Sequence, residues 1–111
     1  MVDVHELAIA ESVVSSVMER VSGPVTVVRL RVGRLAGVVP DALTFCFDLA
    51  SAGTPLEGAV LEIEEQQGRA SCRTCGEEFL MADAFLLCSC GSADVELLAG
   101  RDLAVMSVEV A

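Results

Sequence analysis

The spacing of apolar residues along the chain predicts two helices. Between residues 6 and 22 apolar side chains recur every three or four positions, the period of a helix with one buried face. This helix should end at Gly23-Pro24, since proline cannot continue the helical hydrogen bonding. A second helix should begin at Pro40 and end near Gly53. The expected apolar positions are Leu7, Ala10, Val14, Val17, Met18 and Val21 in the first helix, and Leu43, Cys46, Phe47 and Ala50 in the second.

Three further segments alternate apolar and polar side chains, the period of a strand with one buried face. They are residues 25–32, 59–65 and 103–110. The polar face of the first strand carries Arg29 and Arg31. That of the second carries Glu62 and Glu64, so ion pairs across a shared sheet are expected. The last strand has an apolar face made by Ala104, Met106, Val108 and Val110.

The segment between the second and third of these strands lacks such a regular pattern. Residues 69–97 are short, turn-rich and contain four cysteines, which is typical of a small metal-binding module. The last strand most simply returns to pair with the first two. We therefore predict an α+β fold, a small three-stranded sheet with two helices, plus an inserted four-cysteine, zinc-ribbon-like module. The predicted domains are a discontinuous α/β domain, residues 1–68 and 99–111, and a zinc-binding domain, residues 69–98.

Charge narrows the choice of partners. The 111 residues carry 17 acidic side chains against seven basic ones, a formal net charge of -10. Nucleic-acid binding depends on cations that neutralise phosphates, so this balance argues against it. No apolar run approaches the roughly 18 residues that a membrane span needs, and the acidic first residues do not resemble a secretory signal. We expect a cytoplasmic location and neither a membrane nor a nucleic-acid partner.

Four of the five cysteines predict a structural zinc site. They are Cys72 and Cys75, a CxxC pair, and Cys88 and Cys90, a CxC pair, and a glycine follows each pair. Four thiolates form a closed tetrahedral zinc site without an open position for catalysis. The metal also supplies folding energy that a module of about 30 residues cannot draw from a core. A redox pair or unligated cysteines are the alternative, and the CxC spacing constrains the backbone more than CxxC does.

Three other residues have a simpler interpretation beside a chemical one. Cys46 lies on the apolar face of the second helix, where a buried small hydrophobe is expected rather than a soft metal ligand. Asp41 in the first turn favours the helix N-terminus, or assists a metal. His5, the only histidine, is by itself more often an exposed polar residue than a ligand. Because this single histidine lies in a frayed N-terminal position, a Ser/His/Asp set is not expected, and four sulfur ligands leave zinc no open site, so we do not expect an enzyme.

An ordered series of motifs resembles one known family. The motifs are His5-Glu6-Leu7, Val32-Gly33-Arg34-Leu35, Val39-Pro40-Asp41-Ala42-Leu43, Phe45-Cys46-Phe47-Asp48, Gly53-Thr54, the two cysteine pairs with Cys90-Gly91-Ser92, and Ser107-Val108-Glu109-Val110. Over nearly its whole length the chain resembles the HypA/HybF family of nickel metallochaperones for hydrogenase maturation.

This resemblance implies a function, ligands and partners. Family members bind nickel at an N-terminal Met-His-Glu sequence and pass it to the large subunit of a [NiFe] hydrogenase. They work with a HypB-type GTPase, and some also serve urease and its accessory proteins. Nickel, the cargo, would bind His5 and Glu6, while structural zinc would bind the four paired cysteines. The competing function is a zinc-ribbon module for protein interaction or nucleic-acid binding, without nickel.

The sequence departs from the family pattern at two places. Met1-Val2-Asp3-Val4 precedes His5, which separates the terminal amine from the compact square-planar chelate that Ni(II) favours. We hypothesise that Val4 is the true first residue, read from an internal GTG start codon. If it is not, Asp3 or Asp41 would have to complete the nickel site. The second departure is the CxC pair, where the family commonly has CxxC.

Overall fold

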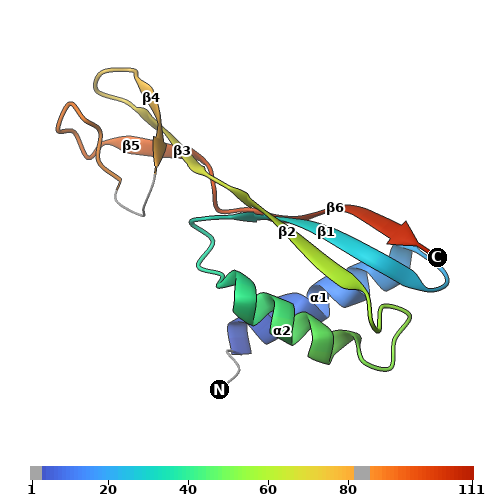
Figure 1. Ribbon diagram of the computed structural model, residues 1–111. Coiled ribbons are helices and arrows are strands. Elements are labelled where there is room, and N and C mark those ends of the chain that lie inside the picture. Colours follow the sequence, from blue (N-terminus) through green and yellow to red (C-terminus); the bar gives the residue numbers. More distant parts are fainter. Residues whose placement is uncertain (1–3, 82–85) are drawn as a thin grey trace. The chain divides into compact units, whose positions relative to one another are not determined.

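The computed structural model describes residues 4–81 and 86–111. Within them the elements follow in the order α1 (Val4–Arg20), β1 (Val25–Gly33), α2 (Pro40–Ser51), β2 (Val60–Gln66), β3 (Gly68–Cys72), β4 (Glu78–Met81), β5 (Val95–Ala99) and β6 (Leu103–Val110). Two three-stranded sheets have the strand orders β2-β1-β6 and β4-β3-β5, and β3 runs antiparallel to both of its neighbours. In the first sheet β1 and β2 run in the same direction, whereas β6 runs opposite to β1 (Figure 1). The α+β class is confirmed, and the last strand returns to the sheet of the first two predicted strands, where it pairs with β1 and not with β2.

The chain forms two compact units. The helix-sheet unit comprises Met1–Leu30, Val38–Glu64 and Ala104–Ala111. The cysteine unit comprises Arg31–Gly37 and Glu65–Leu103. The domain boundaries expected from the sequence, at residues 68/69 and 98/99, stay predictions. Neither described helix is long and apolar enough to cross a membrane.

In the helix-sheet unit, both helices lie on the same side of the β2-β1-β6 sheet (Figure 1). Because β1 is the central strand, its apolar side chains on that side are removed from water, and Val28 and Leu30 are both 0% exposed. The helices close the core with the side chains of Ala10, Val13, Val14, Val17, Leu43, Cys46 and Phe47. Cys46 is fully buried, as its helical spacing predicts.

Two apolar stretches are less buried than their pattern suggested. Met18 of α1 is 45% exposed, and Val13 lies in the core although the expected stripe did not include it. In β6, Met106 and Val110 are 46% and 54% exposed. β6 is an edge strand with one neighbour, so alternation of apolar residues does not by itself place a covering layer over it.

Of the expected ion pairs across the sheet, the structure shows the one between Arg29 and Glu62, and it adds one to Glu109. The Arg29 guanidinium donates to Glu62 on β2 at 3.3 Å and to Glu109 on β6 at 2.9 Å, and it also reaches the Ser107 hydroxyl. The hydrogen bond to Glu109 raises the pKa of Arg29, and the charge of Glu62 adds to this. Arg29 thus links all three strands on one face.

The cysteine unit is built on β3, which lies between its two antiparallel neighbours. Ala70 is opposite Phe79 of β4 and Leu97 of β5. Close by, two glycines bring backbones into contact: a methyl group added at Gly33 would lie 2.1 Å from the carbonyl oxygen of Gly100. No side chain fits between these segments.

Candidate metal centres

The first cysteine loop, residues 72–77, continues directly from β3. The Cys72 N–H donates to the Glu77 carbonyl at 2.9 Å, and the Gly76 N–H donates to the Cys72 carbonyl at 2.8 Å. Gly76 has a φ of +77°, which side chains rarely tolerate and which glycine adopts freely. The turn also points the Cys75 N–H at the Cys72 sulfur, 3.5 Å away. The backbone therefore fixes both thiols.

The second cysteine loop, residues 88–92, closes in the same way with one residue fewer. The Cys88 N–H donates to the Ser92 carbonyl at 2.9 Å, and the Gly91 N–H donates to the Cys88 carbonyl at 2.9 Å. Gly91 again has a positive φ, +93°. The shortened CxC spacing thus keeps both closing hydrogen bonds of the longer loop.

Polar contacts join the first cysteine loop to the second loop and to Asp94 just after it. The hydroxyls of Thr74 and Ser92 lie 2.7 Å apart, one on each loop. Arg73 pairs with Asp94 through its guanidinium, at 3.0 Å, and through a bond from its N–H to the Asp94 carbonyl. The loops are consequently held at a fixed spacing by bonds that do not involve sulfur.

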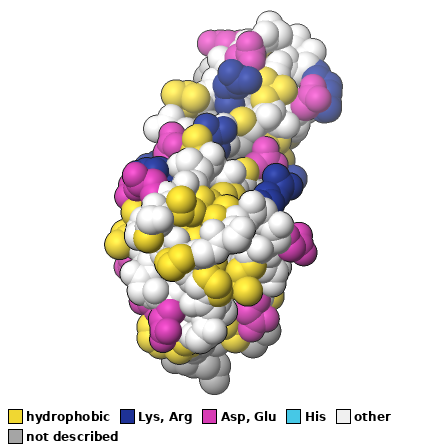
Figure 2. All heavy atoms as spheres, turned by 90° about the vertical axis from the view of Figure 1, so that its right-hand side faces the viewer, with side chains coloured by type: hydrophobic (Ala, Val, Ile, Leu, Met, Phe, Trp, Pro, Cys, Tyr) yellow, Lys and Arg dark blue, Asp and Glu magenta, His cyan; other side chains and the backbone are white. Residues whose placement is uncertain are grey.

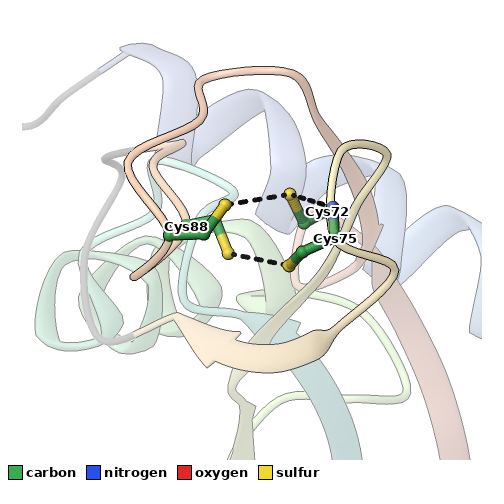
Figure 3. A group of neighbouring side chains, drawn as sticks. Cys72, Cys75 and Cys88 are labelled. Atoms are coloured by element: carbon green, nitrogen blue, oxygen red, sulfur yellow. Dashed lines mark hydrogen bonds between the residues drawn. The ribbon is translucent and has the colours of Figure 1, made fainter.

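The four cysteine sulfurs converge on one point. All four lie within 4.8 Å of one another. The separations are 3.7 Å between Cys72 and Cys90 and 3.6 Å between Cys75 and Cys88. Figure 3 shows the thiols of Cys72, Cys75 and Cys88 directed toward one another. A tetrahedron of sulfurs at about 2.3 Å from zinc has edges of about 3.8 Å, so this donor set fits a Zn(II) ion.

Hydrogen bonds set the pKa values of these thiols apart. The backbone of Cys75 lowers the pKa of Cys72 to about 6, against the effect of burial. The backbone of Glu77 lowers the pKa of Cys75, but the neighbouring thiols of Cys88 and Cys72 outweigh it and raise it to about 12. For Cys90, the backbone of Ser92 lowers the pKa, while the Cys88 thiol and burial raise it overall. At neutral pH Cys72 is a thiolate, whereas Cys75 and Cys90 retain protons that a metal must displace.

The other predicted ligands, His5 and Glu6, lie together in the first turn of α1. The His5 Nδ1 is 3.5 Å from the Glu6 Oε1. The imidazole is 55% exposed, but the carboxylate side chain is only 1% exposed. The two side chains are thus neighbours, but His5 is open to solvent and Glu6 is buried in the protein.

Glu6 is held by the start of α2. Its Oε1 accepts a hydrogen bond from the Val39 N–H at 3.4 Å. The Val39 carbonyl in turn accepts the first helical hydrogen bond of α2, from the Leu43 N–H at 3.0 Å. The second oxygen of Glu6, Oε2, is buried and has no hydrogen-bond partner within the part of the chain that the structure describes. A buried carboxylate oxygen of this kind calls for an explanation.

Sequence reasoning did not foresee that Glu6 is buried. The signal was present, since Glu6 precedes Ala10, Val13 and Val17 at spacings of four, three and four, the stripe that α1 buries. Asp41, by contrast, is exposed in the first turn of α2, where a negative charge suits the helix N-terminus.

Three arginines of the cysteine unit lie beside carboxylates. Arg34 pairs with Glu65 at 3.5 Å, Arg69 with Glu78 at 4.0 Å and Arg73 with Asp94 at 3.0 Å. Figure 2 shows this mixing on one face of the molecule, where basic side chains adjoin acidic ones. Because each of these three arginines faces a carboxylate, the three do not form a continuous basic patch.

Comparison with known proteins gives a consistent result. Residues 4–110 match the family described as hydrogenase/urease nickel incorporation, metallochaperone, HypA. The hydrogenase maturation factor HypA of Streptomyces avermitilis is 50% identical over 111 residues, covering 94% of this chain and 85% of the relative. That of Trichormus variabilis is 46% identical over 107 residues, covering 96% of this chain and 95% of the relative.

A solved structure shows the same fold. The solution structure of the nickel metallochaperone HypA from Helicobacter pylori has a TM-score of 0.67 and 16% identity, covering 95% of this chain and 96% of that chain. The curated relatives carry the sequence similarity, and this structure carries the fold. Together with the four-cysteine cluster, these matches establish that the chain belongs to the HypA family of nickel-incorporation metallochaperones for hydrogenase and urease.

Proposed function

We propose that the chain is a nickel metallochaperone that binds Ni(II) through His5 and Glu6 and delivers it to the large subunit of a [NiFe] hydrogenase. A HypB-type GTPase is the proposed partner in delivery, and urease with its accessory proteins is a further proposed recipient. The protein acts as a carrier and not as an enzyme. The proposed location is the cytoplasm.

The pairing of His5 with Glu6 is the observation that supports this proposal most directly. An imidazole nitrogen and a carboxylate oxygen 3.5 Å apart offer the N and O donors that suit Ni(II). A carrier must release its metal as well as bind it. The half-exposed imidazole of His5 gives an acceptor protein access to the metal, which a buried cage would not.

Zinc, in this proposal, is bound by Cys72, Cys75, Cys88 and Cys90 and has a structural role. The support is the fit of the sulfur separations to a tetrahedral tetrathiolate, together with the closing hydrogen bonds of both loops. When bound, zinc would link the two loops covalently and leave no position for a reacting ligand. The zinc-ribbon alternative without nickel has less support, because the arginines named above are paired with carboxylates.

The N-terminus completes the proposal. Translation from Val4 would place the terminal amine next to His5, where amine, imidazole and amide nitrogens can chelate Ni(II) together. The family match, which begins at residue 4, supports this start. Residues 1–3 lie outside the described part of the chain. Mass spectrometry of the protein purified from its native host should give a mass without Val2 and Asp3. A mature chain that retains these two residues ends this part of the proposal.

Calorimetric nickel titration tests the nickel site. We expect His5→Ala to weaken Ni(II) binding at least about a hundredfold in the chain that starts at residue 4, since the variant loses the only imidazole. Glu11→Gln, on the exposed side of the same helix, is the matched control and should bind nickel like wild type. Zinc content, measured by elemental analysis, should be one ion per chain in every variant. Equal nickel binding by wild type and His5→Ala would remove His5 from the site.

A further inference from the structure

One face of α2 exposes apolar side chains. Phe45 is 54% exposed and Leu49 is 51% exposed, while Phe47 on the opposite face is 1% exposed. Val39, which immediately precedes the helix, is 58% exposed. Single exposed apolar residues are ordinary on protein surfaces. Three along one short helix, including an aromatic ring, form a candidate contact surface.

Acidic residues border this apolar stripe on one side. Asp41 and Asp48 are exposed, and the sequence of α2 contains no basic residue. An ideal helix advances by about 100° per residue, so Asp41 and Asp48 fall within about 20° of each other. Around the helix axis, Phe45 lies about 40° and Leu49 about 80° from Asp41, on the side away from Asp48. The solvent side of α2 is thus an arc of about 100°, acidic along one margin and apolar along the other.

This surface begins beside the Glu6 carboxylate. The Val39 N–H donates to Glu6 at 3.4 Å, and Val39 also starts the hydrogen bonding of α2. A partner that covers Val39 and Phe45 would therefore lie on the residue whose N–H holds Glu6. This position gives the surface a use in metal transfer, and that use rests on the proposed function.

We propose that Val39, Asp41, Phe45, Asp48 and Leu49 form a docking surface, the α2 surface, for an amphipathic helix of a partner protein. The partner helix would present leucine-like side chains flanked on one side by lysine or arginine. Its apolar stripe covers Phe45 and Leu49, and its cations face Asp41 and Asp48.

Charge distinguishes this occupant from a second copy of the chain. Two α2 surfaces facing each other would oppose their aspartates, and each chain already carries a net charge of -10. A helix of 12 residues is about 18 Å long, so it can bury only a small interface. Small interfaces belong to transient complexes, which suits a protein that must dissociate after delivery.

A synthetic helical peptide provides the probe. It has about 18 residues, with leucines at i, i+3, i+4 and i+7, lysines along one flank of the leucine stripe and alanines elsewhere. A fluorescent label reports binding by anisotropy, at low and at physiological salt. We expect the double variant Phe45→Ser/Leu49→Ser to bind at least about tenfold more weakly than wild type. Asp48→Asn should bind about threefold more weakly, with a shallower dependence on salt.

The controls separate docking from general attraction to an acidic protein. Val60→Ser changes an equally exposed apolar residue, 56% exposed, on β2 of the same unit and should bind the peptide like wild type. Circular dichroism establishes that the variants keep their helices. A second peptide, with serines in place of the leucines, should bind at least about tenfold more weakly than the first. In ¹H–¹⁵N NMR spectra, the amide shifts caused by the first peptide should centre on residues 39–52.

Several results would overturn the proposal. Equal binding of the serine peptide would leave only charge attraction, and amide shifts centred on another element would put the contact elsewhere. A wild-type dimer in sedimentation that the Phe45→Ser/Leu49→Ser variant dissolves would assign the surface to a second copy. The experiment is independent of nickel. His5→Ala should keep the wild-type peptide affinity, and the α2 double variant should keep the wild-type nickel affinity. Failure of nickel binding would therefore leave the docking result intact.

Discussion

The cysteine cluster and the His5–Glu6 pair differ in how completely the fold builds them. Around the cysteines, two loops repeat the same closing hydrogen bonds, and the Thr74–Ser92 contact joins them before any metal is considered. At the start of α1, one ligand is half exposed and the other is buried with an unsatisfied oxygen. The first arrangement suits an ion that stays, and the second suits an ion that leaves.

The difference lies in the backbone as well as in the donor atoms. Each cysteine loop fixes its thiols through a main-chain turn with a positive φ, which glycine adopts freely, at Gly76 and Gly91. Glu6 instead depends on one long hydrogen bond from Val39, 3.4 Å, in a different part of the chain. A site that depends on two distant segments can change when either one moves, whereas the cysteine loops are each fixed locally.

The largest expected effect comes from removing one sulfur. We expect Cys88→Ser to weaken zinc binding by about a thousandfold or more, because a hydroxyl does not replace a thiolate as a zinc ligand. Competition with a chromogenic chelator measures the affinity. Ser89→Ala, an exposed change between the two ligands of the same loop, is the control and should keep wild-type affinity. The helical circular dichroism should persist, since both helices belong to the helix-sheet unit. Unchanged zinc affinity in Cys88→Ser would mean that the thiol cluster does not bind the ion.

Acidification should weaken zinc binding steeply. The metal-free Cys75, with its pKa raised to about 12, and Cys90, also raised, each hold a proton at neutral pH that zinc displaces. Affinity therefore rises with pH, and these two displaced protons alone lower it by about a hundredfold between pH 7 and pH 6, a factor of ten for each proton. Below about pH 6 the Cys72 thiolate also takes up a proton, so the fall becomes steeper. Chelator competition across this range measures the slope. A slope near zero would contradict the assignment of protonated thiols.

A smaller effect should separate stability from nickel binding at Glu6. Glu6→Gln keeps an acceptor for the Val39 N–H but replaces the buried acid, whose Oε2 lacks a partner in the described part of the chain, by a neutral amide. We expect the free energy of unfolding, measured with urea, to rise by about 1 kcal/mol. Nickel affinity should fall by about tenfold, because an amide is a poorer ligand than a carboxylate. A less stable variant with wild-type nickel affinity would show that Glu6 only supports the fold.

Much of the fold could be predicted because its periodic patterns are long and consistent. The alternation around Val28 and Leu30 predicted a strand, which the fold places at the centre of its sheet, and the helical spacing of Leu43, Cys46 and Phe47 predicted the buried face of α2. The strand β6 was harder, since its alternating residues predict a strand but not which element covers it. Met106 and Val110 are about half exposed for this reason, at 46% and 54%.

In the candidate sites, too, some features could be predicted from the sequence and others could not. The two cysteine pairs, each followed by glycine, identified the thiol cluster from the sequence, and the structure brings all four sulfurs together. The hydrogen bonds that let CxC replace CxxC join main-chain atoms, which leave no trace in residue identity. The Glu6–Val39 contact is 33 residues apart in sequence and depends on how α1 and α2 pack. Only the fold shows why one carboxylate of α1 is unlike the others.

The contact between Gly33 and Gly100 has a genetic consequence. Every codon one nucleotide away from a glycine codon that still encodes an amino acid other than glycine adds at least a Cβ atom. At Gly33 that atom would meet the carbonyl oxygen of Gly100 at 2.1 Å and its carbon at 2.2 Å, far inside van der Waals contact. No single missense change at this codon is therefore conservative. In a mutational scan, depletion here should be as complete as at the cysteines, although glycine has no side chain with which to act.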